Sequence, residues 1–352
     1  MTATPPVRVG VIGFGYAGRT FHAPLIASLD ALELVAVCTT RPEAAAPVCP
    51  GARVVATPEA LLADPAVELV VIATPNAQHA PLALRAIAAG KSVLVEKPFA
   101  LDRAEAETVL AAGAAAGVHV AAFQNRRWDS DFLTVRAALA EGRIGPVRHF
   151  ESHFDRFRPT VRDRWREQDG AGAGIWYDLG PHLIDQALQL FGSPVTVSAQ
   201  IAGMRAGART DDWFHAVLSY DDLRVVLHAS MLVAGGVPRF VAHGEGGSLV
   251  KAGADRQEAQ LLRGQGPGDG DGDGDWGHDP DPLQVWDADG ARPPVPARPG
   301  DQREIYRQLA AAIRGTAPCP TSADEILSVM AVLDAGRRSA REGRTVSLDA
   351  GR

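Results

Sequence analysis

The sequence predicts a two-domain α/β protein: an N-terminal Rossmann-type, doubly wound parallel sheet, then an α+β domain with a large, mostly antiparallel open sheet. The chain has 352 residues, which is enough for two ordinary domains. In its first third, short and continuously apolar runs alternate with helical segments, as in a parallel sheet that is covered on both faces. Farther on, longer strand-like runs follow one another with tight connections, as in an antiparallel sheet.

The first domain is predicted over residues 1–125. Its six strand-like runs lie at 7–13, 33–40, 52–56, 67–75, 92–98 and 118–123, and the clearest helices between them lie at 79–90 and 101–117. The carboxyl ends of parallel strands meet at one edge of such a sheet, where ligands bind. We therefore expect the residues that follow these strands to carry the function.

The second domain is predicted over residues 126–352. A helix at 128–142 precedes strands at 147–157, 195–202, 213–220, 223–232 and 239–244, and helices at 302–314 and 322–341 close the chain. The Asp/Gly-rich stretch 264–282 is predicted to be a flexible surface loop. Its opening resembles a calcium-binding loop, but Pro280 stands where the twelfth-position glutamate is needed, so no metal is expected.

Composition excludes several classes of partner. The formal net charge is -7 and the pI is about 5.8, which argues against a nucleic-acid partner. The three cysteines form neither a metal-ligand pattern nor a disulfide framework, which favours a reducing cytoplasm. The N-terminus lacks the pattern of a signal peptide, and no apolar run approaches the roughly 18 residues of a membrane span.

A glycine motif directly follows the first strand and opens a helix. It reads Gly13-Phe14-Gly15-Tyr16-Ala17-Gly18. The first glycine of such a motif allows a tight turn, the second lets the backbone approach a pyrophosphate at the helix N-terminus, and the third permits close packing of helix on strand. This context predicts a dinucleotide site rather than a plain strand-to-helix turn.

The end of the second strand indicates which dinucleotide is bound. An NAD site carries an acidic residue there, which binds the ribose 2′-hydroxyl. Here Thr39, Thr40 and Arg41 occupy this place. Two hydroxyls and a guanidinium suit a 2′-phosphate, so NADP is favoured over NAD.

Two further segments end at the same predicted edge. Thr74-Pro75-Asn76 and His79 follow the fourth strand, where Asn76 also suits a helix cap. Glu96-Lys97-Pro98 ends the fifth strand. A lysine with restricted access to solvent polarises a substrate oxygen or exchanges its proton, although a lysine at a strand end often just reaches into water.

In the second domain, Asp178 and His182 are separated by a Gly-Pro. Pro181 suits the first turn of a helix that runs to Gly192, which predicts His182 in that turn and Asp178 just before it. No His-Cys cluster accompanies the pair, so a metal site is not expected. A hydride-transfer site needs a group that handles the hydroxyl proton, and an imidazole held by a carboxylate can do so.

Taken together, these motifs resemble the Gfo/Idh/MocA oxidoreductases over nearly the whole chain. The resemblance rests on the glycine motif, Glu96-Lys97-Pro98 and the Asp178/His182 pair. Trp165-Arg166 matches a "WR" before a glycine cluster, which here departs from GGG as Gly172-Ala173-Gly174. The stretches 21–26, 125–132 and 151–159 resemble a narrower branch that includes NADPH-dependent scyllo-inositol dehydrogenases.

The resemblance implies transfer of a hydride between NADP(H) and a ring secondary alcohol or ketone of a cyclitol or sugar. Lys97, Asp178 and His182 correspond to the family's catalytic trio and would also contact the substrate. We assign proton exchange to His182, a hydrogen bond to the same oxygen to Lys97, and orientation of both to Asp178, while the first two roles are interchangeable. The implied cofactor-binding set is Gly13, Phe14, Gly15, Tyr16, Ala17, Gly18, Thr39, Thr40, Arg41, Thr74, Pro75, Asn76, His79, Glu96, Lys97, Asn125, Trp165 and Arg166.

His153 and Asp155 fall on one face of an extended strand and are candidate substrate ligands, although this alternation also fits a solvated sheet face. The resemblance further implies a homo-oligomer, either a dimer or a tetramer. The competing hypothesis is a dinucleotide-binding sensor or regulator of the same fold without catalysis. An enzyme that reduces an open-chain or linear, biliverdin-like molecule is a further alternative. The intact trio favours catalysis.

Overall fold

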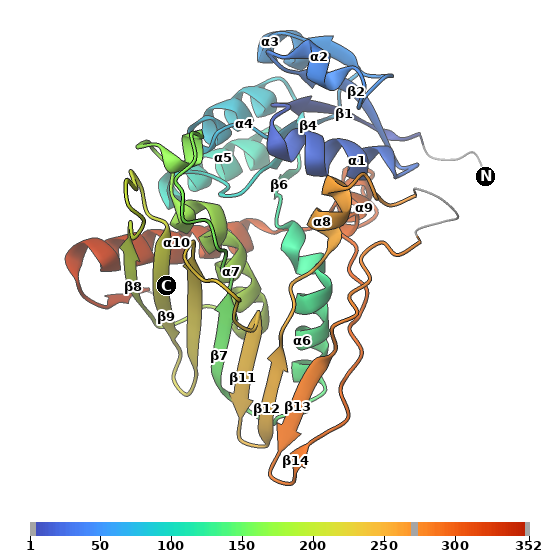
Figure 1. Ribbon diagram of the computed structural model, residues 1–352. Helices are drawn as coiled ribbons and strands as arrows, with labels where there is room; N and C mark the ends of the chain where they lie inside the picture. The colour runs from blue at the N-terminus through green and yellow to red at the C-terminus, as the bar shows by residue number, and fades with distance from the viewer. Residues whose placement is uncertain (1–4, 269–273, 349–352) are drawn as a thin grey trace. The chain divides into compact units, whose positions relative to one another are not determined.

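The computed structural model describes residues 5–268 and 274–348. The chain divides into two compact units (Figure 1). Unit 1 comprises residues 1–125, 257–276 and 301–327, and unit 2 comprises residues 126–256, 277–300 and 328–352. The chain thus passes from unit 1 to unit 2 after residue 125, and residues 257–276 and 301–327 group with unit 1.

Unit 1 contains a six-stranded parallel sheet, as the sequence predicted. Its order is β3-β2-β1-β4-β5-β6, and its bounds are β1 Val7–Ile12, β2 Leu32–Cys38, β3 Arg53–Val55, β4 Leu69–Ile72, β5 Ser92–Val95 and β6 Val120–Ala122. The helical elements of this unit are η1 Gly18–His22, α1 Ala23–Ala27, α2 Pro42–Ala45, α3 Pro58–Leu62, η2 Asn76–Gln78, α4 His79–Ala88, α5 Arg103–Ala116, α8 Gln257–Leu262 and α9 Glu304–Ile313. Every residue of β4 and β5 is buried, because helices that cover both faces of a parallel sheet favour apolar strands.

The strand order reverses between β1 and β4, which pair with each other in the centre of the sheet. Segments that leave these two strands at their carboxyl ends diverge to opposite sides and open a crevice for ligands. Gly13 follows β1 and Thr74 follows β4 closely, so two predicted segments meet at this point. Glu96 follows the adjacent strand, β5, and its N–H donates to the carbonyl of Ile72 at 3.0 Å.

Unit 2 contains a nine-stranded sheet in the order β14-β13-β12-β11-β7-β10-β9-β8-β15. Its strands are β7 Val147–His153, β8 Thr196–Ala202, β9 Trp213–Ser219, β10 Arg224–Ser230, β11 Phe240–Gly244, β12 Gly247–Lys251, β13 Leu283–Asp287, β14 Gly290–Ala291 and β15 Val346–Ser347. Among the described strands of this sheet only β7 and β10 pair in parallel, which confirms the mostly antiparallel prediction. Strands β12 to β15 were not predicted.

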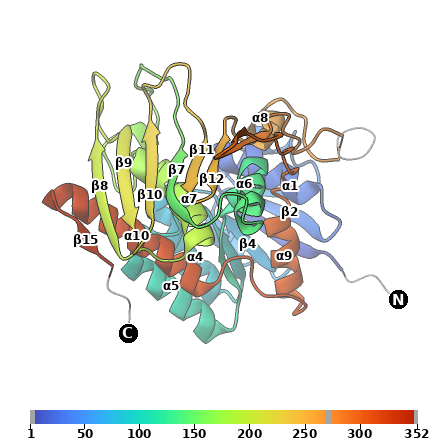
Figure 2. The same ribbon diagram turned by 90° about the horizontal axis from the view of Figure 1, so that it is seen from below.

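One face of this sheet is covered by helices (Figures 1 and 2). The long ones are α6 Ser130–Ala140, α7 Ile175–Phe191 and α10 Ala323–Glu342, and two short turns are η3 Asn125–Trp128 and η4 Trp165–Glu167. Phe214 of β9 packs edge-on against Trp176 of α7 at 4.9 Å between centroids, and Phe240 of β11 packs on Phe132 of α6 at 6.5 Å. The core of unit 2 therefore lies between these helices and this face.

Part of the Asp/Gly-rich stretch departs from the predicted flexible loop. Residues 269–273 lie outside the described residues. Trp276, however, is buried, and its indole N–H donates to Asp301 at 3.2 Å. Asp279 is also buried and pairs with the ammonium of Lys251 at 2.7 Å. A buried ion pair is costly to break, so the segment after Gly274 is anchored.

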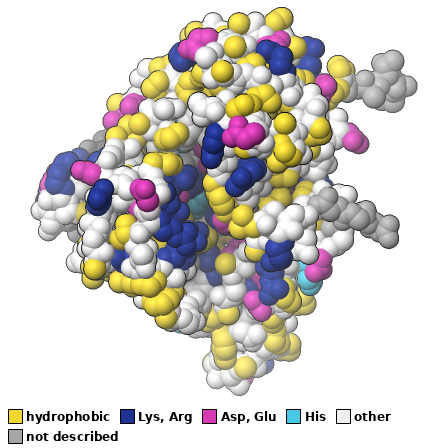
Figure 3. Space-filling view, turned by 45° about the horizontal axis from the view of Figure 1, so that its top comes forward, with side chains coloured by type: hydrophobic (Ala, Val, Ile, Leu, Met, Phe, Trp, Pro, Cys, Tyr) yellow, Lys and Arg dark blue, Asp and Glu magenta, His cyan; other side chains and the backbone are white. Residues whose placement is uncertain are grey.

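No helix in residues 5–268 and 274–348 is long and apolar enough to cross a membrane. Acidic and basic side chains are interspersed with apolar ones over most of the face drawn in Figure 3. This mixture fits a chain with a modest formal net charge of -7.

Candidate functional site

The glycine motif of unit 1 has the geometry of a phosphate-binding turn. Gly13 has a positive φ of 97°, and a Cβ on it would lie 2.4 Å from the carbonyl oxygen of Ala73. A Cβ on Gly18 would lie 2.3 Å from the carbonyl oxygen of Gly13. At Gly15 a Cβ would meet nothing within 4 Å. Two glycines are therefore required by the turn itself, whereas Gly15 leaves space for the close approach of a ligand.

The other residues of the motif have structural partners. Phe14 is buried in a hydrophobic cluster with Val37 of β2. Tyr16 is exposed, and its hydroxyl donates to Glu258 of α8 at 2.7 Å. Phe14 thus holds the turn on the core, while Tyr16 remains at the surface.

The segment that follows β2 carries the basic side chain of Arg41 in place of the acidic residue of an NAD site. Thr39 is buried, and its hydroxyl oxygen accepts the N–H of Arg41 at 3.1 Å. Thr40 and Arg41 are exposed. No ion pair joins Arg41 to a carboxylate of the described residues. The guanidinium is therefore available to an anionic group.

Two residues of the segment after β4 are relevant to the site: Thr74, for its hydroxyl oxygen, and His79, for its hydrogen bonds to two loops. The hydroxyl oxygen of Thr74 is buried and has no hydrogen-bond partner among the described residues, as expected where a ligand completes the site. Asn76 is buried and Pro75 is exposed. His79 is completely buried, and its two ring nitrogens face the carbonyl oxygens of Thr74 at 3.0 Å and Pro98 at 2.7 Å. His79 therefore joins the loop after β4 to the loop after β5, and its side chain is not accessible to a ligand.

Glu96 and Lys97 stand beside this segment. One carboxylate oxygen of Glu96 is 3.1 Å from His22 Nε2, and the other accepts the backbone N–H of Lys97 at 3.0 Å. Lys97 is partly buried, and Asn125, the last residue of this part of the unit, is buried. Unit 1 thus brings together the glycine motif, Thr74 and Lys97 at one edge of its sheet.

In unit 2, Asp178 and His182 lie on helix α7, which begins earlier than predicted. The helix starts at Ile175, so Asp178 lies inside the first turn and Pro181 lies within the helix. Residues four apart share one helical face, and the two side chains therefore point to the same side. His182 is 5% exposed.

A distant residue explains the early start of α7. Gly174, the N-cap residue, has φ +94°, and Asp211 takes over the capping. The carbonyl of Asp211 accepts the N–H of Ile175 at 2.9 Å, and its carboxylate accepts the N–H of Trp176 at 2.7 Å. The sequence offers no local signal for this, because Asp211 lies beyond β8 in the chain.

Trp165 and Arg166 lie close to Asp178 in unit 2. The guanidinium of Arg166 sits over the Trp165 ring at 4.5 Å, and its Nε is 3.3 Å from the Asp178 carboxylate. A small pocket beside them is lined by Gly174 and Arg205, among others. Arg205 is buried and pairs with Glu167 at 3.0 Å and Asp212 at 2.8 Å, so it fixes the loop that carries Arg166.

His153 and Asp155 are not brought together with Asp178 and His182. Ser152 of β7 faces the helices, since Arg239 bonds both its hydroxyl, at 2.6 Å, and Gln186 of α7, at 2.7 Å. Successive side chains of a strand alternate between faces, so His153 lies on the opposite face of the sheet. The predicted role of this pair as ligands of the same substrate therefore has no support from unit 2.

The opposite face instead carries a cluster of imidazoles and carboxylates. His153 bonds Glu151 at 2.7 Å and is 3.6 Å from Asp155, which is in turn 3.6 Å from His228. Burial lowers the pKa of His153, but Asp155 and Glu151 outweigh it and raise the pKa above its usual value. No group of three or more His, Cys, Asp or Glu side chains in the described ranges is arranged to hold a metal ion.

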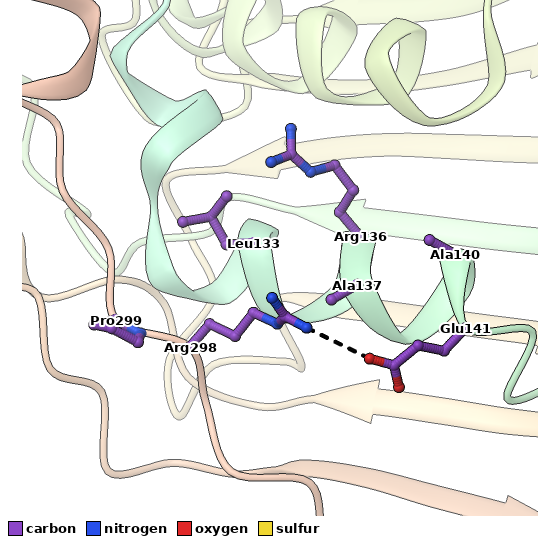
Figure 4. Close-up of a pocket in the computed structure, with 7 residues that line it drawn as sticks. All are labelled: Leu133, Arg136, Ala137, Ala140, Glu141, Arg298 and Pro299. Carbon is purple, nitrogen blue, oxygen red and sulfur yellow. Dashed lines mark hydrogen bonds and ion pairs between the residues drawn. The ribbon is translucent and has the colours of Figure 1, made fainter. Parts of the chain in front are cut away.

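A separate groove of about 640 Å³ runs along α6 (Figure 4). Leu133 and Ala137 line it, and Arg298 pairs with Glu141 across one side at 3.4 Å. None of the predicted site residues lines this groove.

Comparisons with known proteins identify the family of the chain. Residues 7–123 match the model of an oxidoreductase family with an NAD-binding Rossmann fold, and residues 132–250 match the GFO/IDH/MocA C-terminal domain. The chain is 44% identical to the "Uncharacterized oxidoreductase YdgJ" of Escherichia coli, over 97% of this chain and 99% of that protein. It is 36% identical to scyllo-inositol 2-dehydrogenase (NADP(+)) IolW of Bacillus subtilis, over 97% and 96%.

The fold is also similar to that of solved structures. A crystal structure from Klebsiella pneumoniae superposes with a TM-score of 0.91 at 47% identity, and covers 99% of this chain and 96% of that one. The two family models thus cover most of the chain, one within each part of it, at residues 7–123 and 132–250. The chain belongs to the GFO/IDH/MocA family of NAD(P)-dependent oxidoreductases.

Proposed function

We propose that this oxidoreductase uses NADP(H) and interconverts a ring secondary alcohol and its ketone in a cyclitol or sugar. The observation that carries the cofactor choice is the exposed Arg41 at the end of β2, where Thr39, Thr40 and Arg41 stand in the place of the acidic residue of an NAD site. The substrate class rests on the intact trio and on two relatives named for inositol. One is IolW, and the other is the inositol 2-dehydrogenase of Rhizobium meliloti, which is 29% identical.

The residues of the crevice fit such a cofactor. Gly15 leaves room for a pyrophosphate, the buried hydroxyl of Thr74, which lacks a partner among the described residues, can bond a ligand, and Arg41 can hold the 2′-phosphate. When bound, the nicotinamide supplies or accepts the hydride. The protein's part is then to bind and orient the alcohol and to move its proton.

We assign the proton to His182 and the stabilising hydrogen bond on the same oxygen to Lys97, and these two roles are interchangeable. Asp178 accepts a charge-assisted contact from Arg166 at 3.3 Å, which fixes its carboxylate on the face of α7 that carries His182. Asp178 can therefore orient the catalytic groups. The homo-oligomer that the family resemblance implies stays a prediction.

A screen for NADP+ reduction over inositol isomers and aldoses tests the proposal. Lys97→Ala and His182→Ala should each lower turnover on the best substrate by about a hundredfold or more, the size of general acid–base effects. Dinucleotide affinity should be retained. His278→Ala, which removes an exposed imidazole of unit 2, is the matched control and should leave turnover unchanged. Near wild-type turnover in both active-site variants would show that the assignment is wrong.

A further inference from the structure

Three polar side chains that are far apart in the sequence meet in the interior of unit 1. His22 of η1 has Nδ1 2.6 Å from the hydroxyl of Tyr306 on α9, and Nε2 3.1 Å from Glu96 after β5. His22 and Tyr306 are 0% exposed. The Phe123 ring packs against the His22 imidazole at 4.4 Å between centroids and excludes water from it. Buried polar groups at this depth are retained only when their hydrogen bonds are satisfied.

The direction of each hydrogen bond follows from the chemistry of the groups. Burial raises the pKa of Glu96, but His22 outweighs it and the net pKa lies below its usual value. Glu96 is therefore an acceptor, and His22 Nε2–H donates to it. Burial holds the pKa of Tyr306 well above its usual value, so the phenol keeps its proton and donates to His22 Nδ1. The chain of bonds runs from Tyr306 through His22 to Glu96.

Glu96 also holds the backbone of Lys97, the residue that follows it. Its first oxygen is held by His22, while its second oxygen accepts the backbone N–H of Lys97 at 3.0 Å. The next residue is also held, because His79 bonds the carbonyl of Pro98 at 2.7 Å. The charged and titratable groups around Glu96 are thus His22, His79, Lys97 and Tyr306.

We propose that Tyr306, His22 and Glu96 are positioning residues for Lys97. Tyr306 and His22 hold Glu96 ionised and in one orientation, and Glu96 fixes the backbone of Lys97 and keeps a negative charge beside its ammonium. This relay connects the helix after the glycine motif to the strand end that carries the lysine. Its catalytic consequence rests on the proposed function, whereas its effect on Lys97 itself does not.

The lysine content of the chain makes that effect measurable without any substrate. The sequence holds three lysines, Lys91, Lys97 and Lys251. The ammonium of Lys91 is buried and donates to two carbonyls, and Lys251 is buried in its pair with Asp279. Labelling with trinitrobenzenesulfonate, followed by mass spectrometry of the peptides, therefore reports on Lys97 against two protected lysines.

Glu96→Gln removes the charge, and Tyr306→Phe removes only one hydroxyl and keeps the ring. We expect Lys97 to be labelled at least about threefold faster in Glu96→Gln and about twofold faster in Tyr306→Phe, because a less restrained amine reacts faster. Tyr220→Phe is the matched control, since it removes a tyrosine hydroxyl that donates to Gly192 in unit 2 at 2.9 Å. Wild-type labelling rates in both unit 1 variants would overturn the proposal, and Tyr306→Phe decides alone if Glu96→Gln does not fold.

Kinetics with the best substrate separate positioning from a loss of folding. Tyr306→Phe should lower kcat by about three- to tenfold and leave the KM for the dinucleotide within about twofold, since the effect acts only through Lys97. A change in the dinucleotide KM with constant kcat would contradict a role for the relay in positioning Lys97. If the wild type turns over no cyclitol or sugar, the proposed function fails, and the labelling experiment still decides on the relay.

Discussion

At the scale of single residues, cofactor preference depends on the charges that follow β2. Arg41 is exposed there, and its backbone N–H is fixed by the hydroxyl of Thr39 at 3.1 Å. A carboxylate at this place would accept from a 2′-hydroxyl and repel a 2′-phosphate. The guanidinium can do the reverse, through a charge-assisted hydrogen bond to the phosphate.

Arg41→Ala tests this directly. One hydrogen bond to a charged group contributes about 1.5–3 kcal/mol, which is roughly ten- to hundredfold in affinity. We expect the wild type to favour NADP+ over NAD+ by at least about tenfold in kcat/KM, and the variant to lose most of this margin through its KM for NADP+. Arg85→Ala, which removes a guanidinium paired with Glu59 on the surface of unit 1, is the control and should keep the ratio. A wild type that prefers NAD+ would refute the interpretation.

At the scale of elements, the helix α7 sets the positions of Asp178 and His182. Its two ends are both glycines with positive φ, 94° at Gly174 and 72° at Gly192. They differ in their surroundings. A Cβ on Gly174 would lie 2.0 Å from a carboxylate oxygen of Asp211, whereas a Cβ on Gly192 would meet nothing within 4 Å. The start of the helix therefore leaves no room for a side chain, whereas its end does, although the Tyr220 hydroxyl bonds the carbonyl of Gly192 there at 2.9 Å.

Gly174→Ala and Gly192→Ala form a matched pair for this element. Gly192→Ala should cost about 1–3 kcal/mol of unfolding free energy, the strain of an alanine in a backbone region that is essentially restricted to glycine. Gly174→Ala should cost about 3 kcal/mol or more, because it also displaces the Asp211 cap. Only Gly174→Ala should lower kcat, since Asp178 lies in the first turn. Urea unfolding and steady-state kinetics measure both effects, and equal costs for the two variants would speak against a tertiary cap.

At the scale of the whole molecule, the chain leaves unit 1 after residue 125 and returns to it twice, at 257–276 and 301–327. The first return contains α8 and the start of the Asp/Gly-rich stretch, and the second contains α9 with Tyr306. Trp276 and Asp301, at the ends of these returns, bond to each other at 3.2 Å. Segments that are distant in sequence thus complete the first unit.

Replacing residues 269–273 with a Gly-Ser segment of equal length tests whether the Asp/Gly-rich stretch has a role as a whole. Trp276 is left in place. We expect an unchanged thermal midpoint and turnover, because Pro280 replaces the carboxylate that a calcium loop requires. Thermal unfolding with and without calcium is the measurement. A calcium-dependent rise in the wild-type midpoint that is lost in the variant would contradict this expectation.

The sequence by itself determined the local features of this protein. The apolar runs predicted six parallel strands and the glycine spacing predicted the turn after β1, because both depend on neighbouring residues. The positions of Arg41 and Lys97 could be predicted for the same reason, and both residues lie just after the carboxyl ends of their strands, β2 and β5. Helices α9 and α10 were predicted within about two residues of their observed bounds.

Only the tertiary structure decided the features that depend on distant residues. The helix α7 begins at Ile175 because Asp211, some 36 residues later in the chain, caps it. Strand alternation placed His153 and Asp155 on one face, but it did not tell which face the helices cover. Glu96 bonds His22 of η1, which is 74 residues away in the chain, and His22 bonds Tyr306 of α9, which is 284 residues from it. Hydrogen bonds between such distant groups form only when packing brings them together, and no local pattern encodes them.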